Sequence, residues 1–378
     1  MIYIMTAEIL NAIALGMIKG VGPKIGRNLY AAAGSFVGVM EMDLADLIKI
    51  DSVSEVTAKE IIRQREEVLL KAESEVEWME KFDVEALFLT DSRYPTRLRM
   101  CDDAPMVLYV KGSADLNSRI VLSVIGTRRP TAYGREWCRE VIGELSKCHP
   151  DMLVVSGLAY GIDVVAHKAA LECGVKTVGV VAHGLDKVYP SQHREIAKQM
   201  VMGGGAMLTE YYRGIEPEAP NFISRNRIVA GMADATLVVE SGEKGGSLIT
   251  TARAIEYNRV VLAMPGSPLQ EMSRGCNTLI RQQKARLVTS ASDIDEVMNW
   301  VSESSHEAIQ GELFPTAESL TEEQRKIYDV LLSGEKTADE IGRECNVRVS
   351  ELSATLLEME FIGIVKGLPG SRYMLIKS

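Results

Sequence analysis

Residues 119–300 alternate short apolar runs with helical segments, and this alternation constrains the fold more than any other feature of the sequence. Each run is rich in Val, Ile or Leu and is bounded by Gly, Pro or Ser, as buried strands are. A helical segment separates most neighbouring runs, which is the pattern of βαβ units with parallel strands. The sequence therefore predicts an α/β fold with a doubly wound, mostly parallel sheet, whose strands lie at 120–125, 153–155, 177–181, 206–209, 235–239, 260–263 and 286–289.

The segment before this sheet predicts a small all-α domain at residues 1–80. A turn at 18–27 interrupts its helical pattern and is typical of a helix-hairpin-helix, because Gly20 and Gly22 permit a tight turn and Pro23 suits a first helical position. Two interpretations of this turn stay open: its backbone N–H groups hold a DNA phosphate, or the domain is purely structural. A looser copy at 48–57 lacks the glycines, and there we favour the structural interpretation.

The predicted sheet domain covers residues 81–300. Within residues 70–118 we expect a charged helix followed by an irregular stretch that covers one edge of the sheet. A polar, patternless linker follows at 301–319. Residues 320–378 give three helical segments and a glycine-rich hairpin, which predict a winged helix. Its third helix carries Glu351, Glu358 and Glu360. Because glutamates repel phosphates, we favour a protein-contact or structural role for it over reading of a DNA groove.

The charge of the chain is unevenly distributed. The net charge is −10, yet residues 119–290 carry five more basic than acidic side chains. An acidic protein with a basic middle can bind a polyanion locally. The six Cys and five His lack the spacing of metal ligands, so we predict no metal and reduced thiols. Neither a signal peptide nor an apolar run long enough for a membrane span is recognisable, so we expect a cytoplasmic protein without membrane contact.

Glycine, serine and threonine recur where the predicted strands pass into helices. Such junctions present unpaired helix N–H groups, which suit an anionic phosphate. Basic side chains fall in or near the same junctions, where one polyanion lying across the strand ends would meet them together: Arg128, Lys168, Arg225, Arg227, Lys244 and Arg274.

Several enzyme signatures are missing from these junctions. The first one lacks Gly-x-Gly-x-x-Gly, which argues against a dinucleotide dehydrogenase. The sequence also lacks a P-loop and a Gly-x-Ser-x-Gly elbow. Asp163 and His167 lie four residues apart on one predicted helix. They could form a catalytic pair, but we favour a capping role for Asp163 and a core role for His167.

Five segments together resemble the DNA-processing protein A (DprA, also called Smf) family. They are Ser156 to Asp163 with His167, the Arg-Asn-Arg at 225–227, and the runs at 246–252, 263–267 and 275–280. The sequence departs from the family in two places: Tyr-Asn-Arg at 257–259 stands where a Gly-Arg pair is usual, and Gln-Lys-Ala at 283–285 stands where Gly-Ala is common.

The resemblance implies a Rossmann-like sheet, a helical N-terminal domain and a terminal winged helix. It also implies a protein without catalytic residues or cofactor that binds single-stranded DNA, protects it during natural transformation and loads the RecA recombinase. Such proteins act as homodimers, on strands coated by single-strand DNA-binding protein. The predicted DNA-binding residues are Arg128, Arg129, Ser156, Gly157, Gly161, Lys168, Arg225, Arg227, Lys244, Gly246, Ser247, Thr250, Arg274, Gly275 and Asn277.

Bases are expected to stack on Tyr133, Tyr160 or Phe222, unless these rings are core. Two alternatives remain. A nucleotide N-glycosidase of the lysine-decarboxylase-like (LOG) group would need a glutamate that the turn at 244–251 lacks. A nucleotide sensor would signal through the winged helix.

Overall fold

The computed structural model describes residues 2–300, 320–345, 347, 349–361, 364–368 and 371–375. The chain divides into two compact units, Met1–Trp300 and Val301–Ser378. The segment predicted to be a linker, 301–319, lies outside the described residues. The predicted boundary between residues 80 and 81 falls within helix α5 (Glu55–Phe82), inside the first unit.

Nine strands form one sheet in the first unit, in the order β1-β2-β6-β5-β4-β3-β7-β8-β9. Strands β3 to β9 are parallel, whereas β2 pairs antiparallel with β6, and β1 antiparallel with β2. The strands are β1 (Glu85–Phe88), β2 (Val107–Gly112), β3 (Val121–Ile125), β4 (Leu153–Ser156), β5 (Lys176–Val180), β6 (Ala206–Thr209), β7 (Ala235–Val238), β8 (Val260–Ala263) and β9 (Arg286–Leu287).

The seven predicted parallel strands are confirmed, each within two residues of its expected bounds. The description of 70–118 as a helix followed by an irregular stretch is wrong, because this segment also holds β1 and β2. The two strands were missed because they form an antiparallel pair without an intervening βαβ helix. The expectation that the segment covers a sheet edge is confirmed, since β2 pairs with β6.

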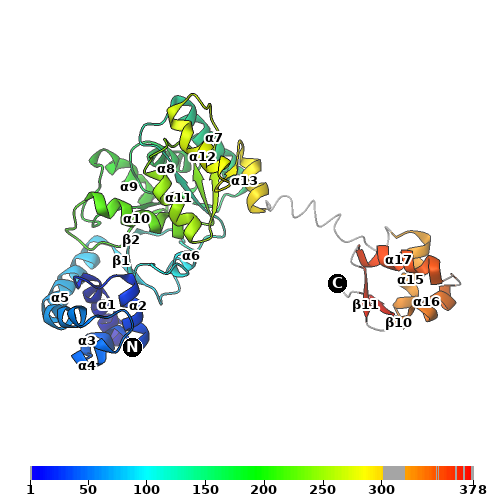
Figure 1. The fold of residues 1–378 in the computed structure, drawn as a ribbon, viewed down its shortest axis with the longest axis horizontal. Helices are drawn as coiled ribbons and strands as arrows, with labels where there is room; N and C mark the ends of the chain where they lie inside the picture. Colours follow the sequence, from blue (N-terminus) through cyan, green and yellow to red (C-terminus); the bar gives the residue numbers. More distant parts are fainter. Residues whose placement is uncertain are drawn as a thin grey trace. The chain divides into compact units, whose positions relative to one another are not determined.

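Helices cover both faces of this sheet, as a doubly wound fold requires (Figure 1). One face packs against α7 (Ala132–Cys148), α8 (Ile162–Glu172), α9 (Arg194–Met202) and α13 (Ala291–Met298). The other packs against α6 (Thr96–Arg99), α10 (Ala219–Gly231), α11 (Ser247–Glu256) and α12 (Arg274–Arg281). Two short 3-10 turns, η1 (Ser191–His193) and η2 (Glu271–Ser273), precede α9 and α12.

The strand order reverses at β3, which lies between β4 and β7. From β3 the chain proceeds outward through β4, β5 and β6, and then returns to continue through β7, β8 and β9. Loops that leave neighbouring strands in opposite directions open a crevice at the carboxyl ends of those strands. The topology therefore places a binding crevice above β3 and its neighbours.

Five helices precede the sheet: α1 (Ile2–Met17), α2 (Pro23–Ala33), α3 (Phe36–Glu41), α4 (Leu44–Ile48) and α5. The predicted hairpin between α1 and α2 is confirmed: Gly20 has a φ of +96°, Gly22 caps α2, and Pro23 begins it. These helices share an apolar core with Met106, Val107 and Tyr109 around β2. The helical domain and the sheet are therefore packed as one unit.

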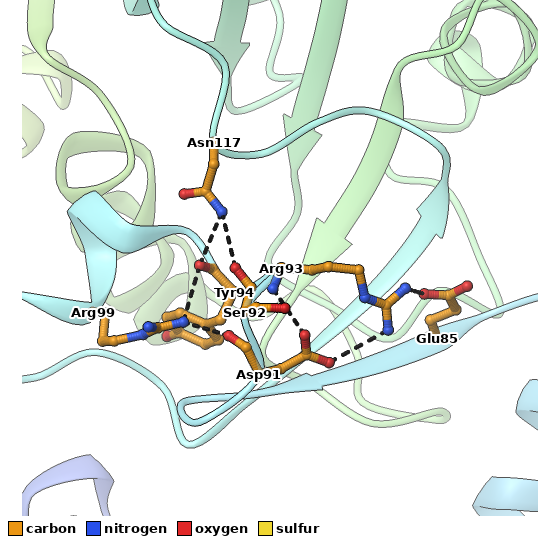
Figure 2. A network of polar contacts seen from close by, with 7 residues as sticks. All are labelled: Glu85, Asp91, Ser92, Arg93, Tyr94, Arg99 and Asn117. Carbon is orange, nitrogen blue, oxygen red and sulfur yellow. Dashed lines mark hydrogen bonds and ion pairs between the residues drawn. The ribbon is translucent and has the colours of Figure 1, made fainter.

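The connection between β1 and β2 is held by a polar network (Figure 2). Arg93 bridges Glu85 and Asp91, at 2.5 and 3.4 Å. Arg99 donates to the backbone carbonyls of Asp91 and Tyr94, and Asn117 reaches the same turn at 3.3 Å. The fully buried Tyr94 ring lies within this turn. These contacts tie α6 to the turn that follows β1.

The second unit contains a winged helix, as predicted. Its elements are α15 (Glu322–Leu331), β10 (Lys336–Thr337), α16 (Ala338–Cys345), α17 (Val349–Phe361), β11 (Val365–Leu368) and β12 (Arg372–Leu375). Thr321 and Gln324 form a capping box at the start of α15. The three strands pair in the order β10-β12-β11, all antiparallel.

Candidate functional site

A cleft of about 490 Å³ lies at the carboxyl ends of β3, β4 and β7, where the topology places a crevice. Its wall is built by the loops after these strands together with α10 and α11. Seven of the predicted site residues line it: Arg128, Arg129, Gly157, Arg225, Gly246, Ser247 and Thr250. Ser156 and Gly161 do not line it but stand at the ends of the loop that supplies Gly157.

The loop after β4 lies against the loop after β3. Gly161, at a φ of +85°, sits where a Cβ atom would lie 2.1 Å from the carbonyl oxygen of Thr127. Only glycine fits this position, because the approach is too close and the φ is positive. The N–H of Ile162 donates to the same carbonyl at 3.2 Å. The two loops therefore form one continuous floor.

Asp163 and Arg225 hold this floor from beneath. Asp163 Oδ2 accepts the N–H of Gly157 at 3.1 Å, and Arg225 Nη1 donates to the carbonyl of Gly157 at 2.6 Å and to that of Val180. Burial raises the pKa of the Asp163 carboxyl, an effect that Arg225 partly offsets. Burial also lowers the pKa of the Arg225 guanidinium to about 10. The Arg225 side chain is therefore a buried clamp on the loop as well as part of the cleft wall.

Ser156 and His167 are also fixed below the cleft. Ser156 Oγ donates to the carbonyl of Val124 at 2.6 Å. His167 Nδ1 lies 2.7 Å from Thr177 Oγ1, which itself donates to Val154. The imidazole therefore carries its proton on Nδ1, and burial lowers its pKa to about 3. Asp163 and His167 have separate partners and form no catalytic pair here. The core role expected for His167 is confirmed. The capping role expected for Asp163 is wrong, because Gly161 caps α8 without a side-chain bond and Asp163 accepts N–H groups of the preceding loop.

A buried carboxylate shapes the loop after β3. Glu240 accepts both the N–H and the hydroxyl of Thr131, at 2.8 and 2.6 Å. Thr131 in turn caps α7 by accepting from Gly134. The Glu240 side chain is only 2% exposed. Both carboxylate oxygens of Glu240 therefore hold the loop that carries Arg128, through Thr131.

The glycine-rich turn after β7 forms the opposite wall. Ser247 Oγ donates to Ser241 Oγ at 2.8 Å, and Ser241 accepts the N–H of Gly275 through its carbonyl. Around Gly246 the space is open, since a Cβ atom there would meet nothing within 4 Å. A ligand can therefore approach the backbone at the start of α11.

The basic residues fall into three groups. Arg128 and Arg129 are exposed in the cleft, and the Arg128 guanidinium lies 5.9 Å from the centre of the Phe222 ring. Lys168, Lys244 and Arg274 are exposed but do not line the cleft. Arg227 is buried, ion-paired with Glu210 and bonded to the carbonyl of Asp103. The structure thus brings together only part of the predicted basic set.

Two further predicted site residues, Asn277 and Gly275, stabilise nearby loops. Asn277 forms hydrogen bonds to both the N–H and the carbonyl of Gly266, at 3.1 and 2.8 Å. Gly275 packs against the carbonyls of Ser241 and Gly242, which leaves no room for a side chain. Both support the loops after β7 and β8, and Asn277 borders a shallow depression together with Arg274.

Sequence reasoning missed Tyr189. Its ring is 47% exposed and lies 5.8 Å from Phe222, centre to centre. The signal that could have found it is positional: the connections after β3, β4, β5 and β6 hold Tyr133, Tyr160, Tyr189 and Phe222 in turn.

No described helix is both long and apolar enough to span a membrane. Across the described ranges, no group of three or more His, Cys, Asp or Glu is placed to hold a metal ion.

Comparisons with known proteins agree with this architecture. A family model described as DNA recombination-mediator protein A matches residues 85–299, and one for the DprA winged helix domain matches residues 313–371. The putative DNA processing protein DprA of Mycobacterium tuberculosis is 37% identical over 275 residues, 71% of this chain and 69% of that protein.

Two solved structures are similar. The X-ray structure of DNA processing protein A from Streptococcus pneumoniae gives a TM-score of 0.64 at 33% identity, covering 75% of this chain and 96% of that one. The protein from Helicobacter pylori gives 0.51 at 26% identity, covering 57% and 96%. The latter structure is described as giving insight into a single-stranded DNA binding mode of the Helicobacter protein.

Proposed function

The chain belongs to the DNA recombination-mediator protein A (DprA/Smf) family, and from this premise we propose that it binds single-stranded DNA in the cleft above β3, β4 and β7. The observation that carries the proposal is the cleft itself, where an exposed arginine, an open glycine-rich turn and an aromatic ring meet. These groups match the phosphates and bases of one strand.

The phosphates are assigned to two elements of the cleft. Arg128 and Arg129 project from the loop after β3, and the start of α11 offers backbone N–H groups at Gly246 and Ser247. Anions bind well at such helix starts because of their unpaired donors. Lys168, Lys244 and Arg274 are assigned to more distant phosphates.

Arg225 and Arg227 take a different part in this proposal. Both guanidinium groups are buried and bonded to backbone carbonyls of the protein. Arg225 shapes the cleft floor, and Arg227 joins α10 to Glu210. Their contribution to DNA binding is therefore positional, through the loops they hold.

The same cleft does not favour a glycosidase. One carboxylate lines it, that of Asp163, and its Oδ2 accepts the N–H groups of Gly157 and Ala159. Glycoside cleavage uses a pair of carboxylates free to exchange protons with the substrate. We therefore propose a binding protein without catalytic residues.

The remaining roles follow from the family and are part of the proposal. The protein would act in the cytoplasm as a homodimer, protect single strands during natural transformation, and load RecA where single-strand DNA-binding protein is present. Two linked clefts on one strand would raise avidity. Light scattering in solution tests whether the protein is a dimer. The assembly of RecA filaments on strands coated by single-strand DNA-binding protein tests RecA loading.

Fluorescence anisotropy tests the binding itself. A labelled oligo-dT and a matched duplex are titrated at several salt concentrations. We expect the single strand to bind much more tightly, with an affinity that falls as salt rises, by a slope of about −0.7 per phosphate on logarithmic axes. A folded protein that leaves oligo-dT unbound at low salt would overturn the proposal.

A further inference from the structure

Aromatic side chains gather at the carboxyl end of one half of the sheet. Tyr133, Tyr160, Tyr189 and Phe222 come from the connections after four successive strands, β3 to β6. Tyr133, Tyr160 and Tyr189 are 59, 43 and 47% exposed.

Two of these rings join the cleft to the surface beside it. Phe222 lines the cleft, with the Arg128 guanidinium 5.9 Å from the centre of its ring. The Tyr189 ring lies 5.8 Å from the Phe222 ring, centre to centre, and is tilted by 52°. Arg128, Phe222 and Tyr189 thus form a continuous surface that runs from the loop after β3 to the loop after β5.

The backbone beneath Tyr189 is fixed. Its N–H donates to His183 Nε2 at 3.2 Å, and His183 is fully buried with Nδ1 2.8 Å from the carbonyl oxygen of Gly184. Burial lowers the pKa of His183, which keeps Nε2 available as an acceptor. Because the backbone at Tyr189 is already ordered, binding a base on its ring costs less ordering of this loop.

Tyr160 is fixed beside the same segment. Its hydroxyl donates to Gln192 at 2.8 Å, and its ring meets His193 edge-on at 5.1 Å. His193 Nδ1 in turn lies 2.8 Å from the carbonyl oxygen of Leu158. Tyr160 therefore extends the exposed aromatic surface along η1.

We propose that a bound strand leaves the cleft over Phe222 and Tyr189, with its bases stacked on these rings and Tyr160 beside them. The inference rests on the proposed function and names the path of the strand. Half-exposed rings adjoining a cation suit nucleobases, whose flat faces stack on aromatic side chains without sequence preference. An aromatic surface that continues from a phosphate-binding cleft therefore complements a single strand, because it offers partners for both its phosphates and its bases.

The test compares two ligands of equal charge. Oligo-dT and a base-free oligonucleotide of the same length carry the same phosphates, so the ratio of their affinities measures the contribution of the bases. Tyr189→Ala is expected to lower this ratio by about five- to a hundredfold, while the salt slope stays unchanged. Tyr189→Trp is expected to restore the ratio, because its ring can stack.

Two further variants serve as controls for the effect of Tyr189→Ala. Phe82→Ala removes an exposed ring at the end of α5, outside the proposed path, and is expected to leave the ratio unchanged. Tyr189→Leu keeps apolar bulk but cannot stack, so it replaces the alanine variant should circular dichroism show that variant unfolded.

The outcomes separate the two proposals. An unchanged ratio in folded Tyr189→Ala or Tyr189→Leu protein, with oligo-dT still bound, would overturn the stacking path and leave the binding function standing. In that event the rings would belong to a protein interface. Absence of binding by the unaltered protein would overturn both.

Discussion

Asp163 and Arg225 hold Gly157 from both sides: the carboxylate accepts its N–H, and the guanidinium donates to its carbonyl. Arg225 lies against the glycine, since a Cβ atom at Gly157 would sit 2.6 Å from the guanidinium nitrogens. The three residues therefore form one hydrogen-bonded unit that joins α8, α10 and the loop after β4.

Arg225→Met is expected to destabilise the protein by about 3–5 kcal/mol, because it leaves the Asp163 carboxylate buried without its compensating cation. Adding Asp163→Asn removes that charge and is expected to recover part of the loss. Urea denaturation of the unaltered protein, the two single variants and the double variant measures both effects.

A surface arginine serves as the control for this series. Arg253 pairs with Glu256 on exposed α11, and Arg253→Met is expected to change stability by less than about 1 kcal/mol. If the Arg225→Met variant unfolded at the same urea midpoint as the unaltered protein, the stabilising role of Arg225 would be refuted.

Arg128→Ala is expected to weaken binding of oligo-dT and to reduce the salt slope by about 0.7, the share of one phosphate. The measurement is anisotropy over a salt series. Arg139→Ala changes the net charge equally on the exposed side of α7, and should leave the slope as it is. Equal slopes for the two variants would remove Arg128 from the site.

His167 makes stability depend on pH. Its pKa is about 3 in the folded protein and about 6.5 in the unfolded chain. Between these values the unfolded chain binds a proton that the folded protein excludes. The stability contributed by the neutral ring is thus present above pH 6.5 and is lost as pH falls toward 3, by up to about 1.4 kcal/mol per pH unit.

His167→Asn keeps a donor toward Thr177 but does not titrate. We expect the unaltered protein to lose roughly 2 kcal/mol more than the variant between about pH 7.5 and about pH 5. Urea denaturation at both pH values gives the difference. Parallel losses in the two proteins would show that His167 is protonated in the folded state.

The two departures from the family pattern fall at helix ends. Asn258 and Gln283 have φ values of +55° and +56°. The following residues, Arg259 and Lys284, donate five residues back to Ala254 and Leu279, which is the Schellman arrangement. Glycine is favoured at such positions because side chains strain there. Both helix ends therefore adopt the left-handed conformation without a glycine.

Gln283→Gly is expected to stabilise the protein by about 1 kcal/mol, and Asn258→Gly by less, because asparagine tolerates this conformation. Thermal denaturation measures the change. Gln282→Gly, one position earlier at a φ of −83°, should bring no gain. A lower melting temperature for Gln283→Gly than for the unaltered protein would contradict the argument.

The parallel sheet could be predicted because each of its strands is a short Val, Ile or Leu run between glycine-rich loops. The β1–β2 pair could not, because antiparallel edge strands carry no βαβ spacing. The three helices and the hairpin of the winged helix could be predicted for the same reason, since each is a local pattern of the sequence.

The site was harder to predict than the fold. The cleft lining was foreseen at Arg128, Gly157 and Ser247, since strand-end loops converge in this topology. The burial of Arg225 depends on Val180, which lies 45 residues earlier in the sequence. A sequence shows the charge of such a residue but not the carbonyls that surround it.

The shared core of the N-terminal helices and β2 limits how this architecture can be altered. Apolar residues of α1 and α5 pack against Val107 and Tyr109, so the helical domain has no solvent-adapted surface of its own on that side. Replacing it with another module would require a new side-chain pattern on β2 as well. The N-terminal domain is therefore not exchangeable by itself, because its apolar surface and that of β2 are buried against each other.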